Sequence, residues 1–111
     1  MDIAIETRPE GIAVVRLNGQ LDLRTTSTVK QRLNQVIAEG STRLVVDFAH
    51  VTFIDSSGLA ALISGLKAAR AAGGDLSIAN TSEEVTTIFE FTRLNRVMPL
   101  YATVDEALAA F

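Results

Sequence analysis

Short apolar runs typical of β-strands alternate with amphipathic segments typical of helices along the whole chain. Residues 3–5 show the two-residue period of a half-buried strand, and residues 12–17 form a second run rich in β-branched side chains. Apolar residues within 29–37 follow the spacing of one helix face. The compact run 44–48 is typical of a strand buried on both faces, and residues 59–66 return to helical spacing. This alternation predicts an α/β fold.

Local signals mark the ends of these elements and indicate the elements in the rest of the chain. Turns or helix ends are predicted at residues 8–11, 18–19, 40 and 73–74, where glycine or proline interrupts the pattern. Residues 76–79 predict a short strand, and Pro99 marks residues 97–101 as a weak edge strand. Capping boxes are predicted for Thr28 with Gln31 (in competition with Thr25, Thr26 and Ser27), Thr81 with Glu84, and Thr103 with Glu106.

The resulting order is two strands, then helix, strand, helix, strand, helix, a weak strand and a last helix. Strand–helix–strand units favour right-handed crossovers and parallel pairing, whereas the short first turn favours an antiparallel hairpin. We therefore expect a mixed, mostly parallel sheet of four to five strands, with an N-terminal antiparallel hairpin and about four helices. The helices are expected mainly on one face of the sheet, unless the final helix crosses to the other.

Composition excludes several classes of function. The 111 residues fit a single domain, and 13 acidic against 10 basic residues give a net charge of -3, without the basic surface that nucleic acid requires. The chain has no cysteine and one histidine, which excludes disulfides, thiolate chemistry and a histidine-rich metal site. The apolar stretch 54–66, which contains serines and glycines, is too short to span a membrane. We expect a cytoplasmic protein without cofactors.

The segment Phe53-Ile54-Asp55-Ser56-Ser57-Gly58-Leu59 is the most informative part of the sequence. It leads from an apolar run into Asp-Ser-Ser-Gly, and an amphipathic helix follows. The free N–H groups of a helix N-terminus stabilise anionic oxygen, so a phosphoserine in this first turn would be tolerated. A purely structural interpretation is also open, because Asp and Ser are common N-caps and Gly58 permits close packing.

Together with Gly19-Gln20-Leu21-Asp22, this segment resembles the STAS domain, and more narrowly the bacterial anti-sigma factor antagonists. The resemblance extends to the runs 44–48 and 88–94 and to the Gly73-Gly74 turn, so it implies one STAS domain over residues 1–111.

The resemblance assigns a role to each residue of the motif. It implies that Ser57 is the phosphoacceptor, that Ser56 is its neighbour and helix cap, and that Asp22, Asp55 and Gly58 complete the partner-binding neighbourhood. It further implies a non-enzymatic protein whose unphosphorylated form binds an anti-sigma factor and thereby frees a sigma factor. That partner is also a serine kinase of the histidine-kinase-like ATPase fold, and a metal-dependent phosphatase reverses the modification.

Two alternative functions stay open at this stage. The same fold serves as a non-switching STAS subunit of a signalling scaffold or a transporter assembly. A small serine hydrolase would need His50, expected in the loop before the motif, as base to Ser57, yet the G-x-S-x-G pattern is missing.

Other polar and apolar candidates have ordinary structural interpretations. Capping and turn roles explain Asp22 and Asp55 without a pair of catalytic carboxylates. Asp47, if buried, needs a hydrogen-bond partner. Leu94 and Val97, with Phe91, either form an exposed apolar patch or, as we expect, pack into the core.

Overall fold

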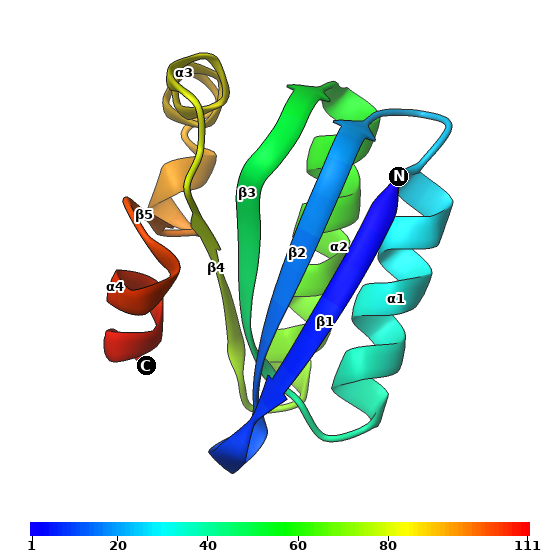
Figure 1. The fold of residues 1–111 in the computed structure, drawn as a ribbon, viewed down its shortest axis with the longest axis vertical. Helices are drawn as coiled ribbons and strands as arrows, with labels where there is room; N and C mark the ends of the chain where they lie inside the picture. Colours follow the sequence, from blue (N-terminus) through cyan, green and yellow to red (C-terminus); the bar gives the residue numbers. More distant parts are fainter.

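Strands and helices follow one another in the order that the hydrophobic pattern predicts (Figure 1). The computed structural model describes residues 1–111 without gaps. The strands are β1 (Asp2–Arg8), β2 (Ile12–Leu21), β3 (Arg43–Ile54), β4 (Asp75–Ala79) and β5 (Leu100–Tyr101). The helices are α1 (Thr26–Ala38), α2 (Ser56–Ala71), α3 (Glu83–Phe91) and α4 (Val104–Ala109), with 3₁₀ turns at Pro9–Gly11 and Leu94–Arg96.

The strands form one mixed sheet in sequential order, β1-β2-β3-β4-β5. β1 pairs antiparallel with β2, and every later neighbour pairs parallel, as predicted. Because successive right-handed crossovers in this order place their helices on one face, α1 and α2 lie together behind the sheet in Figure 1. The final helix does cross over: α4 packs on the opposite face against β3, β4 and β5.

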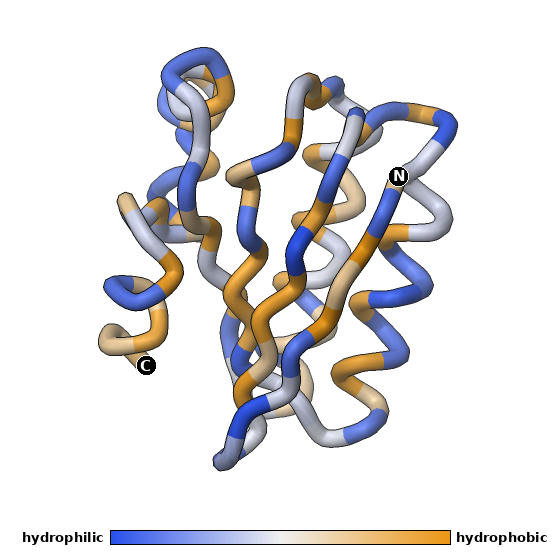
Figure 2. Tube along the Cα trace, viewed as in Figure 1, coloured by the Kyte–Doolittle hydropathy of each residue, from blue (hydrophilic) through white to orange (hydrophobic).

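The main core lies between the sheet and the helices α1, α2 and α3. It contains 20 buried apolar residues, including Phe48 and Phe89, whose rings meet edge to face at 6.3 Å. Figure 2 shows the hydrophobic residues concentrated along the central strands, while α1 alternates between hydrophobic and hydrophilic positions. A smaller cluster of Val14, Val45, Ala79 and Ala107 lies under α4. None of the helices combines the length and hydrophobicity that crossing a lipid bilayer requires.

β2 and β3 are longer than the sequence predicts, because bulges disturb their period. The β2–β3 register shifts twice, and each shift places one extra residue in β3. As a result Phe48, Val51 and Ile54 reach the core face at three-residue spacing, which hides the two-residue period of a strand. Gly19, predicted to end β2, instead adopts φ +125° within the strand.

Two of the predicted capping boxes are wrong and one cap is confirmed. α1 begins two residues before Thr28, so that residue cannot cap it; the N-cap position is Thr25, one of the competing candidates, and its side chain makes no capping hydrogen bond. The cap of α3 is Ser82 rather than its neighbour Thr81, and its Oγ accepts the N–H of the third helical residue at 3.2 Å. Thr103 caps α4 as predicted, accepting the N–H of Glu106 at 3.1 Å.

The chain after α3 departs most from expectation. β5 contains only Leu100–Tyr101 rather than the predicted five residues, directly after Pro99. Phe91 is 89% exposed and Val97 is also exposed, so the expectation that they pack into the core is wrong. Leu94 alone of this trio packs partly against the core.

Asp47 lies buried in β3, at the first bulge, and finds the partners that burial requires. Its Oδ1 accepts hydrogen bonds from Asn80 Nδ2 and from the Ala49 N–H, both at 3.0 Å. The Arg16 Nε lies 3.6 Å from its Oδ2. These contacts give Asp47 a structural role in holding the bulge and the start of the loop after β4.

Candidate phosphorylation site

The Asp-Ser-Ser-Gly segment forms the start of α2, at the edge of the sheet where the parallel strands end (Figure 1). Asp55 is the N-cap residue, and its Oδ1 accepts the N–H of Gly58 at 3.0 Å. Ser56, expected to be the cap, is instead the first helical residue, and Ser57 is the second. An aspartate cap leaves both serine hydroxyls free for other contacts.

Asp55 also fastens this helix terminus to the loop between β2 and α1. Its Oδ2 accepts the N–H of Leu23 at 3.2 Å, and its own N–H donates to the carbonyl of Leu21 at 3.2 Å. From the first turn of α1, the Thr26 hydroxyl donates to the carbonyl of Ser57 at 2.9 Å. The backbone of Ser57 is therefore held by groups that lie about thirty residues earlier in the chain.

Gly58 is required by close packing rather than by its backbone angles. A Cβ atom at this position would lie 2.4 Å from the carbonyl oxygen of Leu21 and 3.0 Å from Ile54 Cγ1. Only a residue without a side chain lets the first turn of α2 approach β2 this closely. The structural interpretation of Gly58 given by the sequence is thus confirmed.

The hydroxyl groups of Ser56 and Ser57 make no hydrogen bond within the protein, and their N–H groups have no acceptor there. Ser56 is exposed and Ser57 is half-buried. These orphan N–H groups and the helix dipole give a locally positive potential. An anionic group attached to Ser57 would be stabilised at this helix terminus.

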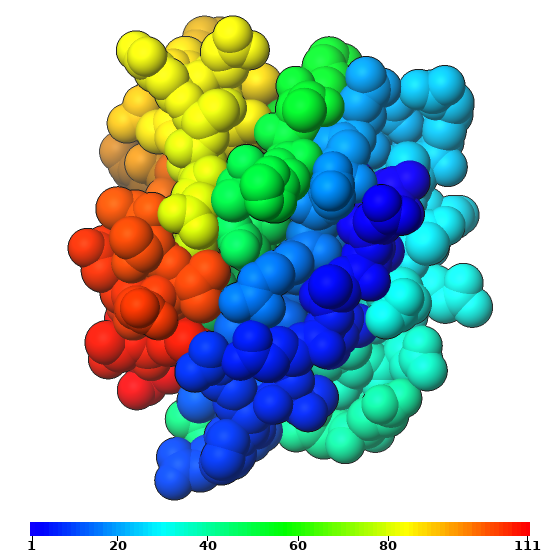
Figure 3. Space-filling model, viewed as in Figure 1, coloured from blue at the N-terminus to red at the C-terminus, as the bar shows by residue number.

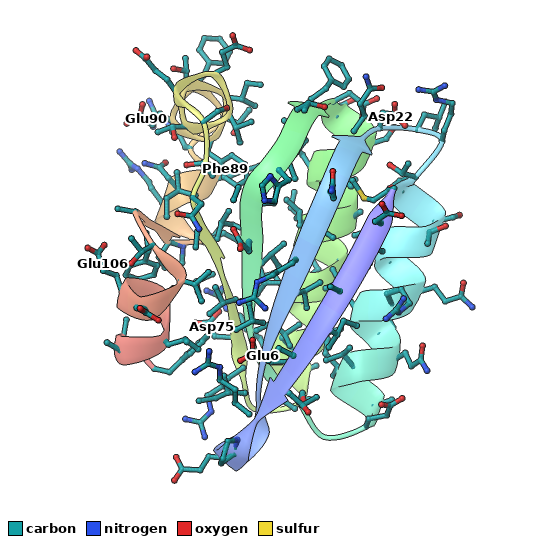
Figure 4. The ribbon with its side chains drawn as sticks, viewed as in Figure 1. Glu6, Asp22, Asp75, Phe89, Glu90 and Glu106 are labelled. Atoms are coloured by element: carbon teal, nitrogen blue, oxygen red, sulfur yellow. The ribbon has the colours of Figure 1, made fainter.

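Asp22 shapes the adjacent loop and makes no hydrogen bond to the serines. It is 8% exposed, and Figure 4 shows it at the end of β2 beside the start of α2. Its Oδ1 accepts the N–H of Arg24 at 2.9 Å, and its Oδ2 lies 3.2 Å from that residue's guanidinium nitrogen. The next residue, Leu23, donates its N–H to Asp55. Asp22 therefore shapes the loop whose next residue, Leu23, is hydrogen-bonded to the N-cap residue Asp55.

Burial of the Asp22 carboxyl raises its pKa, but the hydrogen bonds from the backbone and guanidinium of Arg24 outweigh that effect. The net result lowers the pKa of Asp22 below its ordinary value of 3.8. A carboxylate whose pKa is lower in the folded state stabilises the fold at neutral pH. This contribution disappears as the pH falls through the folded-state pKa.

We expect Asp22→Asn to unfold at lower urea concentration than the wild type at pH 7. The difference in stability should shrink as the pH falls below about 4, because the wild-type carboxyl is then protonated and is neutral like the Asn side chain. Urea unfolding at several pH values measures this, with Glu90→Gln as the control because the exposed Glu90 side chain makes no hydrogen bond or ion pair. A difference between Asp22→Asn and wild type that is independent of pH would contradict the assignment.

The geometry does not support the catalytic alternatives. The carboxylates of Asp22 and Asp55 are both occupied by backbone N–H groups. His50 lies within β3, not in a loop as expected, and pairs with Asn18 of β2. It lines a surface pocket on the sheet face opposite α1 and α2, and Ser57 does not contribute to that pocket. No hydrogen bond joins His50 to Ser57.

The sequence did not indicate the roles of four residues in the site. Arg24 and Thr26 hold the loop and the Ser57 carbonyl, and Leu23 and Phe53 place large apolar side chains in solvent, 73% and 49% exposed. The Asp55–Leu23 hydrogen bond and the pairing of Gln20 with Phe53 bring both apolar residues to the strand-end edge that holds Ser57. The signal available in the sequence was Leu23, an apolar residue between the charged Asp22 and Arg24 in a predicted loop.

Residues 3–107 match the family model of the STAS domain. The chain belongs to the STAS domain family. This match confirms the family resemblance, and the observed sheet and helices confirm the fold class.

Relatives of this STAS domain are similar to it over nearly their whole length. An anti-sigma F factor antagonist from Paenibacillus polymyxa is 27% identical over 110 residues, which cover 97% of this chain and 94% of that protein. The crystal structure of an anti-sigma factor antagonist from Mycobacterium paratuberculosis has a TM-score of 0.87 at 28% identity, covering 98% of this chain and 92% of that one. The structure of the Bacillus cell fate determinant SpoIIAA in its phosphorylated form has a TM-score of 0.76 at 25% identity, covering 98% of both chains.

Proposed function

We propose that this STAS domain is an anti-sigma factor antagonist that is switched off by phosphorylation of Ser57. The observation that carries the proposal is the free Ser57 hydroxyl, half-buried in the first turn of α2 beside two unpaired N–H groups. The names of the relatives support the antagonist role, and the phosphorylated SpoIIAA structure supports the modification.

A phosphate on Ser57 would change the surface without refolding the domain. It adds a charge of about -1.5 to -2, which the helix N-terminus stabilises within the chain. The same charge would stand next to the Asp55 carboxylate and would have to be desolvated in any interface that covers the serine. Binding is thus lost through repulsion and desolvation at the contact itself.

The proposed partner is an anti-sigma factor that is also a serine kinase of the histidine-kinase-like ATPase fold. As kinase it must reach the Ser57 hydroxyl, and as binding partner it must cover the surrounding surface, so one surface serves both events. A metal-dependent serine phosphatase would restore the hydroxyl. The chain itself needs no catalytic group in this scheme, and its net charge of -3 gives it no role in direct nucleic-acid binding.

The phosphoacceptor is tested by mapping the modification. Immobilised chain is used to capture the ATPase from the native host, Mg²⁺ and ATP are added, and the modified residue is located by mass spectrometry. We expect phosphate on Ser57 in the wild type and in Ser56→Ala, and none in Ser57→Ala. Equal phosphorylation of Ser57→Ala, or no ATPase captured by any of the three, would contradict the proposal.

The exposed apolar side chains beside Ser57 predict where the partner binds. Leu23→Ser and Phe53→Ser should each weaken partner binding about tenfold, because apolar residues at the centre of an interface contribute most to affinity. Stability should change by less than about 0.5 kcal/mol for Leu23→Ser, whose side chain is 73% exposed, and by about 1 kcal/mol for Phe53→Ser, because about half of the Phe53 surface is covered in β3. Phe91→Ser is the matched control, an exposed phenylalanine on α3. Titration calorimetry with the captured partner measures this, and equal losses for all three variants would contradict the assignment.

A further inference from the structure

β1 is a long edge strand whose outer side is unpaired. All seven residues pair with β2 in a continuous register from Asp2–Asn18 to Arg8–Ile12, without a bulge or a proline. The other edge of the sheet, β5, has only two residues. Figure 3 shows that α4, in red, leaves the blue edge strand open on the visible face. Because proteins usually shorten, bend or cover such an edge, a regular seven-residue edge is suited to pairing with another strand.

The charges of β1 select one register for antiparallel pairing with a second copy of itself. Backbone groups point outward at every second residue, so a two-fold pairing must be centred on a residue. Centring on Ala4 would place Asp2 opposite Glu6, and centring on Glu6 would place the two Glu6 carboxylates opposite each other. Centring on Ile5 pairs all seven residues and places Asp2 of each copy opposite Arg8 of the other. Opposite charges across a strand pair stabilise it, and like charges destabilise it.

Existing ion pairs are compatible with this register. Arg8 contacts the carboxylate of Glu6 at 2.7 Å, and Arg16 of β2 contacts the same carboxylate at 3.0 Å. When Arg8 faces Asp2 of the second copy, Glu6 therefore keeps a positively charged partner within its own chain. Figure 4 shows Glu6 on the open face of the sheet, where these groups meet.

The groove beside β1 also suits a second copy related by a two-fold axis. It has a volume of about 330 Å³ and lies between β1 and α1, lined by Ile5 and Thr7 and by a polar stripe of α1. That stripe runs from Arg32, in the middle of α1, to the C-cap residue Glu39. The two-fold axis reverses one copy relative to the other, so the two stripes run in opposite directions and Ile5 meets Ile5 at the axis.

We propose that the protein forms a symmetric dimer in which β1 strands of two copies pair antiparallel, centred on Ile5, and join two five-stranded sheets into one. The axis reverses strand direction, so the two Ser57 residues lie at opposite ends of the joined sheet. Both phosphorylation sites stay outside the interface. The dimer is independent of the proposed function, and each can fail without the other.

A charge swap across the strand pair tests the register. Asp2→Arg places arginine opposite Arg8, and Arg8→Asp places aspartate opposite Asp2, so each variant alone should dimerise roughly tenfold more weakly than wild type. An equimolar mixture of the two variants should recover the dimer, because the mixed pair has unlike charges at both ends. The double variant Asp2→Arg/Arg8→Asp should recover it within a single chain.

The association is measured by sedimentation velocity over a concentration series at low salt, with any affinity tag at the C-terminus. Amide exchange gives a second readout: outward N–H groups of β1 should become protected as the wild-type concentration rises, whatever the stability of the variants. A wild type that remains at 11.9 kDa at all concentrations would overturn the proposal. So would single variants that dimerise like the wild type, or a mixture that fails to recover association.

Discussion

Replacing Gly58 with alanine is expected to lower the free energy of unfolding by about 1–3 kcal/mol, the usual range for overpacking a well-filled site. The added Cβ would meet the Leu21 carbonyl oxygen at 2.4 Å and Leu21 Cγ at 2.8 Å. That carbonyl belongs to β2 and also accepts the Asp55 N–H, so it cannot move without disturbing the cap of α2. The gain in helix propensity, at most about 1 kcal/mol, does not offset the clash.

Gly65 provides a matched control in the same helix. A Cβ at this position would approach Leu33 Cδ1 at 2.8 Å and Leu76 Cδ1 at 3.4 Å, which are the flexible ends of two leucine side chains. Gly65→Ala should therefore be nearly neutral, because small side-chain movements accommodate the methyl group and helix propensity favours alanine. Urea unfolding of both variants measures the difference. Equal stabilities of Gly58→Ala and Gly65→Ala would show that the approach of α2 to Leu21 is not what requires glycine.

Gly58→Ala should also weaken partner binding beyond what its stability explains. Relief of the clash moves the first turn of α2 away from β2. Ser57 moves with that turn, which disturbs the hydrogen bond between its carbonyl and the Thr26 hydroxyl. A folded variant in which Ser57 is displaced tests whether position, and not only chemistry, matters at the site. Binding by the folded fraction equal to wild type would contradict this link.

The fold could be predicted from the sequence because the hydrophobic pattern switches between the period of a strand and that of a helix within short stretches of the chain. Strand order, the antiparallel hairpin and most of the helix boundaries follow from runs of ten to fifteen residues and from the glycines between them. The length of β3 could not be predicted in this way, because its two bulges are defined by the register with β2. The caps of α1 and α3 were misplaced since several neighbouring Ser and Thr residues compete and only tertiary packing selects among them.

The same distinction between local and long-range features applies to the site. Asp55, Ser57 and Gly58 are adjacent in sequence, so their placement at a helix N-terminus could be predicted. The contributions of Leu23 and Thr26 could not, because each reaches α2 through a hydrogen bond across about thirty residues. Exposure of Phe53 also depends on the second bulge of β3, which no single-sequence pattern indicates.

Replacing Ser57 with aspartate is expected to weaken binding of the anti-sigma factor between about 5-fold and 150-fold, the range of typical coupling energies in switches. The fold should tolerate the change, because the hydroxyl makes no hydrogen bond and a negative charge in the first turn of a helix is favourable by about 0.3–1 kcal/mol. Loss of binding without loss of stability would place the effect in the interface. Ser57→Ala should bind like the wild type, since it removes the acceptor and adds no charge.

Ser56→Asp separates a specific effect from a general one. It adds the same charge to the same helix terminus, but on an exposed residue that an interface can leave solvated. We expect a smaller loss for Ser56→Asp than for Ser57→Asp, and we expect added salt to recover more of it, because salt screens exposed charges more than buried ones. Isothermal titration at two salt concentrations measures both effects. If Ser57→Asp binds its partners as tightly as wild type, the proposed switch at this residue is contradicted, and the domain is then better described as a constitutive subunit of a scaffold or transporter assembly.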